Sequence, residues 1–177
     1  MLEAATSRRL WYHGDTSPDR NFRDQRWDRD PAVSSLLAEG PGIYFTSRIE
    51  EAQQWYGPYL YAARTSRRFR LLPKRRPTLA ALYAFYGQAS PEDQETFLSN
   101  WPDYTPRQAL SRYANADTLH DAFLGLYRDL FRDPDSWVQA MRSMGYDGVM
   151  LSMMHRDPAR YFLIVWSPEK LDIRPMF

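Results

Sequence analysis

The chain has 177 residues, a formal net charge of +1 and no cysteine. This length suits one domain, with or without a sizeable insertion. The lack of cysteine excludes disulfides, thiolate zinc sites and a cysteine nucleophile. Only three histidines occur, none close to another in sequence, so we expect no metal site. No run of about 18 apolar residues is present, and the first residues lack the apolar core of a signal peptide. We therefore expect a cytoplasmic protein that contacts no membrane.

The first predicted strand, Leu10–His13, is apolar and aromatic and ends at Gly14. An imidazole at a strand terminus can face a pocket, and the alternative is a histidine tied to a neighbouring backbone carbonyl. The polar segment 15–30 has no periodic apolar residues. It is predicted to be a loop that covers a site, with Phe22 and Trp27 as anchors.

A short helix is predicted next, with Asp30 as its N-cap and Pro31 at its first position. Gly40 can end this helix in the left-handed conformation. The helix leads into the stretch 40–57, which has the highest density of structural signals in the chain.

The stretch 40–57, GPGIYFTSRIEEAQQWYG, predicts a glycine turn, a buried strand and a capped helix in succession. Thr46 or Ser47 can cap the helix, and Glu50 follows Ser47 at the spacing of a capping box. Aromatic residues from the strand and from the end of the helix meet at one end of the sheet, where they can stack on a flat ligand. The simpler alternative is a core strand with a core helix behind it.

Strands are predicted next at Tyr59–Ala63 and Phe69–Leu72. A basic cluster in this region can guide phosphates, nucleic acid or an acidic protein surface. The alternative is a solvated strand face that runs into a basic linker. The cluster, which we call the basic segment, comprises Arg64, Arg67, Arg68, Arg70, Lys74, Arg75 and Arg76.

From Thr78 to Met144 the pattern is helical. The clearest helix is Leu119–Phe131, which keeps apolar residues at i, i+3, i+4 and i+7. His120 lies off this stripe and is expected at the surface. Ser136 is expected to cap the last helix, which Gly145 ends.

The C-terminal part returns to strands. The first is predicted at Val149–Met154. A turn that begins at His155 separates it from the second, Tyr161–Trp166, and the third is predicted at Leu171–Ile173. The continuous apolar run of the second strand predicts cover on both faces. Strands, then helices, then strands predict an α+β fold.

These elements resemble the ADP-ribosyltransferase superfamily, on the side of the poly(ADP-ribose) polymerases and diphtheria toxin. Three pieces match in order: Tyr12-His13-Gly14, Gly42-Ile43-Tyr44-Phe45, and Gly145-Tyr146-Asp147-Gly148 followed by a hairpin. The last piece is similar to small bacterial and phage-borne members, including the polyvalent-protein type. The resemblance implies a single domain over 1–177 with split antiparallel β-sheets. The segment 78–144 would then be a helical insertion between the N- and C-terminal sheet halves.

The resemblance also implies that NAD binds between the sheets and is cleaved between nicotinamide and ribose. His13 would hydrogen-bond the ribose that bears adenine, and the Gly14 backbone would grip the nicotinamide amide. Tyr44 would wall the nicotinamide pocket, and Trp55 or Tyr56 would stack on the ring. The implied NAD-binding residues are Tyr12, His13, Gly14, Tyr44, Phe45, Thr46, Ser47, Trp55 and Tyr56, without a metal.

The late strand departs from the family pattern. Active members commonly carry a glutamate there, and a carboxylate stabilises an oxocarbenium-like transition state as it does in glycosidases. The register of Trp166-Ser167-Pro168 places Phe162 at that position. Asp147 or Glu169 is then the candidate replacement, each from a turn, and Asp147 is equally explained as a turn residue. The alternatives are that the reaction proceeds without this carboxylate or that the activity is absent. The candidate catalytic residues are His13, Tyr44 and Asp147.

We therefore expect an NAD-dependent ADP-ribosyltransferase that acts inside a cell as a phage or bacterial effector, with the host cytoplasm as one place of action. Its acceptor is a macromolecule, a protein in preference to a nucleic acid. The alternative is a catalytically inactive binding module on the same fold, which holds a partner through the basic segment or the helical insertion. A third option is a relative that handles RNA phosphate with NAD-like geometry.

Overall fold

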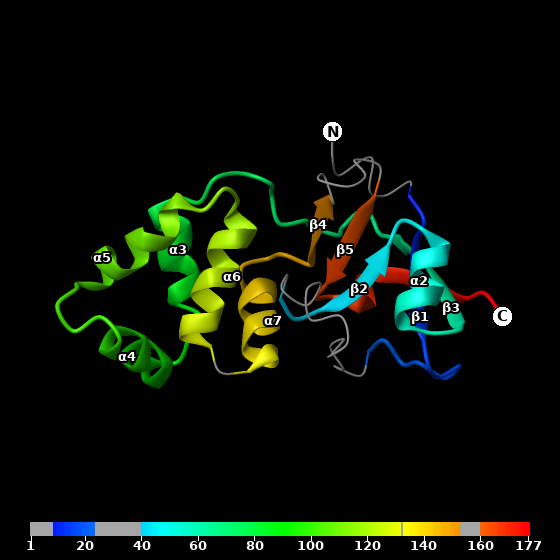
Figure 1. Ribbon diagram of the computed structural model, residues 1–177, viewed down its shortest axis with the longest axis horizontal. Helices are drawn as coiled ribbons and strands as arrows, with labels where there is room; N and C mark the ends of the chain where they lie inside the picture. Colours follow the sequence, from blue (N-terminus) through cyan, green and yellow to red (C-terminus); the bar gives the residue numbers. More distant parts are fainter. Residues whose placement is uncertain (1–8, 24–39, 132, 153–159) are drawn as a thin grey trace.

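The computed structural model describes residues 9–23, 40–131, 133–152 and 160–177 (Figure 1). Over these ranges the fold is α+β, with one antiparallel sheet of six strands and with six α-helices. The strands are β1 (Trp11–Asp15), β2 (Ile43–Thr46), β3 (Tyr59–Thr65), β4 (Gly148–Ser152), β5 (Tyr161–Val165) and β6 (Leu171–Pro175). Their order across the sheet is β4-β5-β2-β1-β3-β6. The predicted α+β class is therefore confirmed.

The pairing of β1 with β2 is the weakest junction in this sheet. The other neighbouring strands have four or five residue pairs in register. Among the described residues, β1 and β2 share only the pair Tyr12 and Thr46. The strands β4-β5-β2 on one side and β1-β3-β6 on the other meet at this junction within the one six-stranded sheet. We call this junction the seam.

Helix α2 (Ile49–Tyr56) packs against β1. A Cβ atom added at Gly14 would lie 2.2 Å from the carbonyl oxygen of Ala52 and 2.6 Å from that of Gly57. Only a glycine in β1 lets the helix backbone approach this closely. Figure 1 shows α2 beside β1 and β3, at the end of the molecule opposite the remaining helices.

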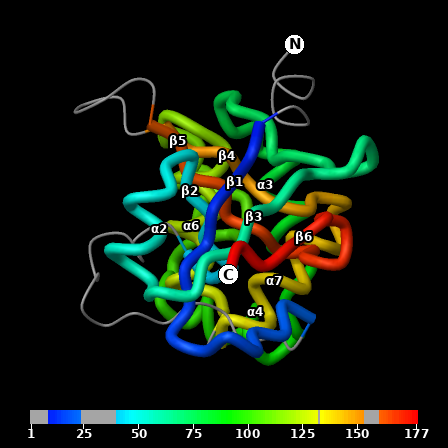
Figure 2. Tube along the Cα trace, turned by 90° about the vertical axis from the view of Figure 1, so that its right-hand side faces the viewer, coloured from blue at the N-terminus to red at the C-terminus, as the bar shows by residue number. Residues whose placement is uncertain are grey.

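The other helices form a group on one side of the sheet, with α7 nearest to the strands (Figure 1). Viewed from the end that carries β1 and β3, this group lies behind the sheet (Figure 2). Trp137 of α7 links the helical group to the sheet, because the centroid of its ring lies 6.0 Å from that of Trp166, which follows β5, and 5.6 Å from that of Phe85 in α3. The elements are α3 (Leu79–Tyr86), α4 (Pro91–Ser99), α5 (Pro106–Ser111), α6 (Leu119–Leu130) and α7 (Pro134–Ser143), with short 3-10 turns η3 (Arg112–Asn115) and η4 (Pro168–Lys170).

Two local predictions around the central stretch are wrong. Phe69–Leu72 is not a strand, since only Leu71 makes an isolated bridge, to Gly148. The capping box at the start of α2 does not form either. Arg48 is the N-cap and no side chain caps the helix. The hydroxyl of Ser47 instead accepts a hydrogen bond from the amide of Tyr161, so a contact with β5 uses the side chain that was expected to cap the helix.

Two predictions in the helical part are also wrong. His120 is 3% exposed rather than on the surface, because α6 packs against Trp137 beyond its main apolar stripe. The N-cap of α7 is Asp133, whose carboxylate accepts from the amide of Ser136. Ser136 therefore lies inside the first turn.

Some expectations fall on other parts of the chain. The helix after Asp30, the anchor Trp27 and the turn at His155 lie outside the described residues. Phe22 is buried, as expected of an anchor. In the part of the chain that the structure describes, no helix has the length and apolar character needed to cross a membrane.

Candidate functional site

His13 lies in the middle of β1 and is 1% exposed, so the expectation that it ends the strand is wrong. Pairing with β3 continues through Gly14 and Asp15 and extends the strand. The Nδ1 atom of His13 lies 2.8 Å from the carbonyl oxygen of Tyr44. A carbonyl only accepts hydrogen bonds, so Nδ1 carries the proton and donates across the seam.

An aromatic shell surrounds the imidazole. The rings of Phe22, Phe45 and Tyr56 have centroids 5.2, 5.4 and 5.4 Å from that of His13. Tyr56 is stacked on His13 with an interplanar angle of 20°. Two of the predicted ligand-binding aromatics, Phe45 and Tyr56, thus form the packing of His13.

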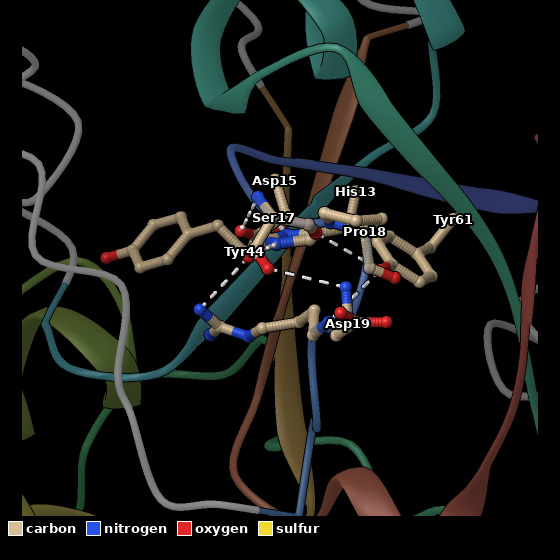
Figure 3. Close-up of polar contacts among 8 residues, drawn as sticks. His13, Asp15, Ser17, Pro18, Asp19, Tyr44 and Tyr61 are labelled. Atoms are coloured by element: carbon tan, nitrogen blue, oxygen red, sulfur yellow. Dashed lines mark hydrogen bonds and ion pairs between the residues drawn. The ribbon is translucent and has the colours of Figure 1, made fainter.

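Asp15 supplies the charge at the other nitrogen of the ring (Figure 3). Its Oδ2 atom lies 3.7 Å from Nε2 of His13 and 3.1 Å from the guanidinium of Arg20, and its Oδ1 accepts from the amide of Ser17. Burial opposes ionisation of Asp15, but the His13, Ser17 and Arg20 contacts outweigh it and lower the pKa from 3.8 to about 2. The carboxylate is therefore ionised throughout the neutral range.

Tyr44 meets His13 through its backbone and not through its ring. The phenol donates a hydrogen bond to the carbonyl of Gly40 and is buried. Figure 3 shows the ring pointing away from the imidazole. The structure therefore does not bring the two predicted side chains into one crevice.

Asp147 lies apart from the seam. It precedes Gly148, which pairs with Val165 at the opposite end of β5 from the pair of Phe162 with Thr46. Its carboxylate accepts from the amide of Arg70 at 2.8 Å and pairs with Lys170 at 2.7 Å. These contacts close the turn before β4, and the carboxylate does not reach His13. Glu169, the other candidate, pairs with Arg142 on the surface.

A second group of side chains gathers where β2, α2 and β5 meet. Thr46 donates a hydrogen bond to Oε2 of Glu51 at 2.6 Å, and Oε1 of Glu51 lies 2.5 Å from Nε of Arg160. The guanidinium of Arg160 lies over the Trp55 ring at 4.6 Å. Trp55 in turn is stacked on Phe162 at 5.6 Å, with an interplanar angle of 22°. We call Thr46, Glu51, Trp55, Arg160 and Phe162 the α2 cluster.

Sequence reasoning found Thr46 and Trp55 but missed Glu51 and Arg160. The spacing of Thr46 and Glu51 across the start of a helix was a usable signal, because it brings a hydroxyl within reach of a carboxylate. Arg160 had no such signal, since its partner is far away in sequence. Of the remaining predicted residues, Tyr12 faces Thr46 in register and Ser47 is bonded to Tyr161.

Two further findings concern metal ligands and the comparison with known proteins. Among the described residues, no three His, Cys, Asp or Glu side chains gather as a group that could hold a metal ion. Comparison of the chain with protein-family models, with curated proteins and with solved structures finds no match.

Proposed function

We propose that this protein is an NAD-dependent ADP-ribosyltransferase that uses the seam and the α2 cluster. One observation carries the proposal: the Trp55 ring holds a flat, delocalised cation, the guanidinium of Arg160, against the carboxylate of Glu51. The nicotinamide ring of NAD is also a flat cation. An aromatic face with a carboxylate beside it is the chemistry that would hold such a ring.

The arrangement of the sheet supports the same proposal. A dinucleotide between two sheet halves requires strands that separate, and β1 and β2 share a single pair in register among the described residues. The motifs Tyr12-His13-Gly14 and Tyr44-Phe45 border this seam from its two strands. We include in the proposal that β4-β5-β2 and β1-β3-β6 form the split pair of sheets that the resemblance implies.

In this proposal the residues that hold NAD have roles different from those that the resemblance implies. Trp55, Thr46 and Glu51 would face the nicotinamide and its ribose. His13 is a positioning residue, because its ring is buried and bonded to the Tyr44 carbonyl. In the reaction, the bond from ribose to the nicotinamide nitrogen breaks and its electron pair leaves with nicotinamide. The acceptor then forms a bond to the same ribose carbon and releases a proton.

The test is nicotinamide release from NAD by the full chain, measured by chromatography. We expect release to fall at least about tenfold in Trp55→Ala, because the ring loses its stacking face. Tyr44→Phe should retain most of the release, since its phenol donates to the Gly40 carbonyl and its ring points away from the imidazole (Figure 3). Tyr104→Ala, which alters an exposed aromatic of the helical group, is the matched control. Release no greater than in buffer, or release unchanged by Trp55→Ala, would overturn the proposal.

A second candidate function, a binding module, is favoured by the basic segment. Every residue of this segment is exposed. It leaves β3 and crosses toward the helical group, where the carbonyl of Arg75 accepts from the amide of Leu119. This candidate predicts affinity for single-stranded RNA or an acidic peptide that falls steeply with added salt and with Arg67→Glu. It also predicts no NAD turnover, so the release assay separates the two functions.

A further inference from the structure

We infer that Glu51, on helix α2, is the carboxylate that faces the substrate cation, and that Arg160 is the cation it holds at rest. This inference rests on the proposed function and assigns the group that the late strand lacks. Phe162 stands where the resemblance implies a glutamate. The structure places a carboxylate from another element, Glu51, in a hydrogen bond with Thr46, the residue in register with Phe162.

Strand register brings Glu51 to that place. Phe162 of β5 is in register with Thr46 of β2, so the two residues are direct neighbours across the sheet. The hydroxyl of Thr46 donates to Glu51 at 2.6 Å, and the ring of Phe162 lies under Trp55. The Glu51 carboxylate is thus hydrogen-bonded to the residue that pairs with Phe162. Through Arg160 it is also linked to the Trp55 ring, which is proposed to stack on nicotinamide.

Burial makes the charge of Glu51 consequential. The Glu51 side chain is 11% exposed, and a carboxylate held out of water needs a cation or several donors. Arg160 supplies the cation from the position immediately before β5. If Arg160 moves away, another cation must take its place or the carboxylate is left uncompensated. The site therefore favours a positively charged ligand over a neutral one of the same shape.

The contact between Arg160 and Glu51 is suited to exchange. Nε of Arg160 lies 2.5 Å from Oε1 of Glu51 but makes no hydrogen bond of acceptable geometry. Arg160 and Glu51 therefore lack the two parallel hydrogen bonds that the strongest arginine–carboxylate pairs form through Nε and Nη. It is retained by charge and by stacking on Trp55, interactions that a nicotinamide cation can also make.

The chemistry gives Glu51 a role in the reaction. As the bond to nicotinamide breaks, positive charge moves from the ring to the ribose, and the leaving nicotinamide becomes neutral. A fixed carboxylate beside that bond stabilises the positive charge that develops on the ribose, and no solvent has to reorganise for this to happen. Glu51 would therefore lower the barrier as well as bind the substrate.

The experiment compares a cationic with a neutral form of the same ring. The full chain is titrated calorimetrically with 1-methylnicotinamide, which is a cation, and with nicotinamide, which is neutral. The variants are Arg160→Met, which keeps an apolar stem, Glu51→Gln, and the two combined. The exposed pair Arg174 and Asp172 provides matched controls, as Arg174→Met and Asp172→Asn.

Arg160→Met should bind 1-methylnicotinamide about tenfold more tightly than the unaltered chain, with little change for nicotinamide. Adding Glu51→Gln should remove this gain, and both control variants should behave as the unaltered chain. Equal changes for the two probes, or no change for either, would overturn the inference. If Arg160→Met does not fold, Glu51→Gln alone decides. In that variant the preference for the cationic over the neutral probe must disappear.

Nicotinamide release separates this inference from the proposed function. Glu51→Gln should lower kcat for release by about 100-fold with a smaller effect on KM. Release that is unaffected by Glu51→Gln removes Glu51 while the transferase stands. Charge-selective binding of the probes without any release from NAD removes the transferase while the cation site stands.

Discussion

Nδ1 of His13 lies 2.8 Å from the carbonyl oxygen of Tyr44, so a side chain of β1 holds a backbone group of β2 beside the one described residue pair that these strands share. This is the contact that the sequence left open as the alternative for His13. The imidazole donates to the backbone carbonyl of Tyr44 at a point where β1 and β2 have no residue pair in register among the described residues. The Tyr44 carbonyl is therefore hydrogen-bonded although β1 and β2 share a single residue pair among the described residues.

Replacing His13 with alanine should lower the free energy of unfolding by about 2–4 kcal/mol. The Tyr44 carbonyl loses its donor, and the aromatic shell loses the ring that it packs on. His13→Asn should recover part of the loss, because its amide can donate to the same carbonyl. Urea denaturation followed by circular dichroism measures both changes. An alanine variant as stable as the unaltered chain would contradict the structural role.

Stability should fall in acid because of Asp15. Its pKa is about 2 in the folded chain against 3.8 in the unfolded chain. The lowered value means that Asp15 stabilises the fold fully above pH 3.8, and that this contribution is lost as the pH falls through about 2. The shift corresponds to roughly 2 kcal/mol.

The measurement is the free energy of unfolding between pH 2 and pH 6 for the unaltered chain and for Asp15→Asn. The variant should be less stable at neutral pH and should have a smaller acid dependence. Asp19→Asn, at an exposed position in the same turn, is the control. An acid dependence that persists undiminished in Asp15→Asn would refute this assignment.

Gly14→Ala should be strongly destabilising, by about 3 kcal/mol or more, because overpacking against backbone has little room to relax. The new methyl group would meet the Ala52 carbonyl at 2.2 Å. Gly87→Ala is the control, since Gly87 has a helical φ of −67° and its nearest neighbouring atom would be 3.3 Å away. Thermal unfolding should separate the two variants clearly. Equal melting temperatures would mean that α2 does not press on β1.

Trp137→Ala should cost about 3–5 kcal/mol, the range for a buried aromatic replaced by alanine. The side chain is fully buried between Phe85 of the helical group and Trp166 next to the sheet. Trp101→Ala should cost less, because Trp101 is only half-buried and stacks on exposed Tyr104. Comparable losses in the two variants would show that Trp137 does not join the helical group to the sheet.

Much of the fold follows from local patterns. The glycine turn, strand and helix of 40–57 all form, and so do the helices between β3 and β4. Signals failed where a distant partner competed for the same group. Ser47 had the spacing of a cap but bonds to Tyr161, and His120 lies off its apolar stripe but is covered by Trp137.

The sequence by itself determined the α+β class, the two strands that carry the proposed motifs and the helices between β3 and β4, because side-chain periodicity and turn residues act between close neighbours. Only the tertiary structure decided what the side chains meet. Strand register and helix packing turned the Tyr44 phenol to Gly40 and joined Glu51 to Arg160. Both outcomes depend on the three-dimensional path of the chain, which brings together groups that no local spacing relates.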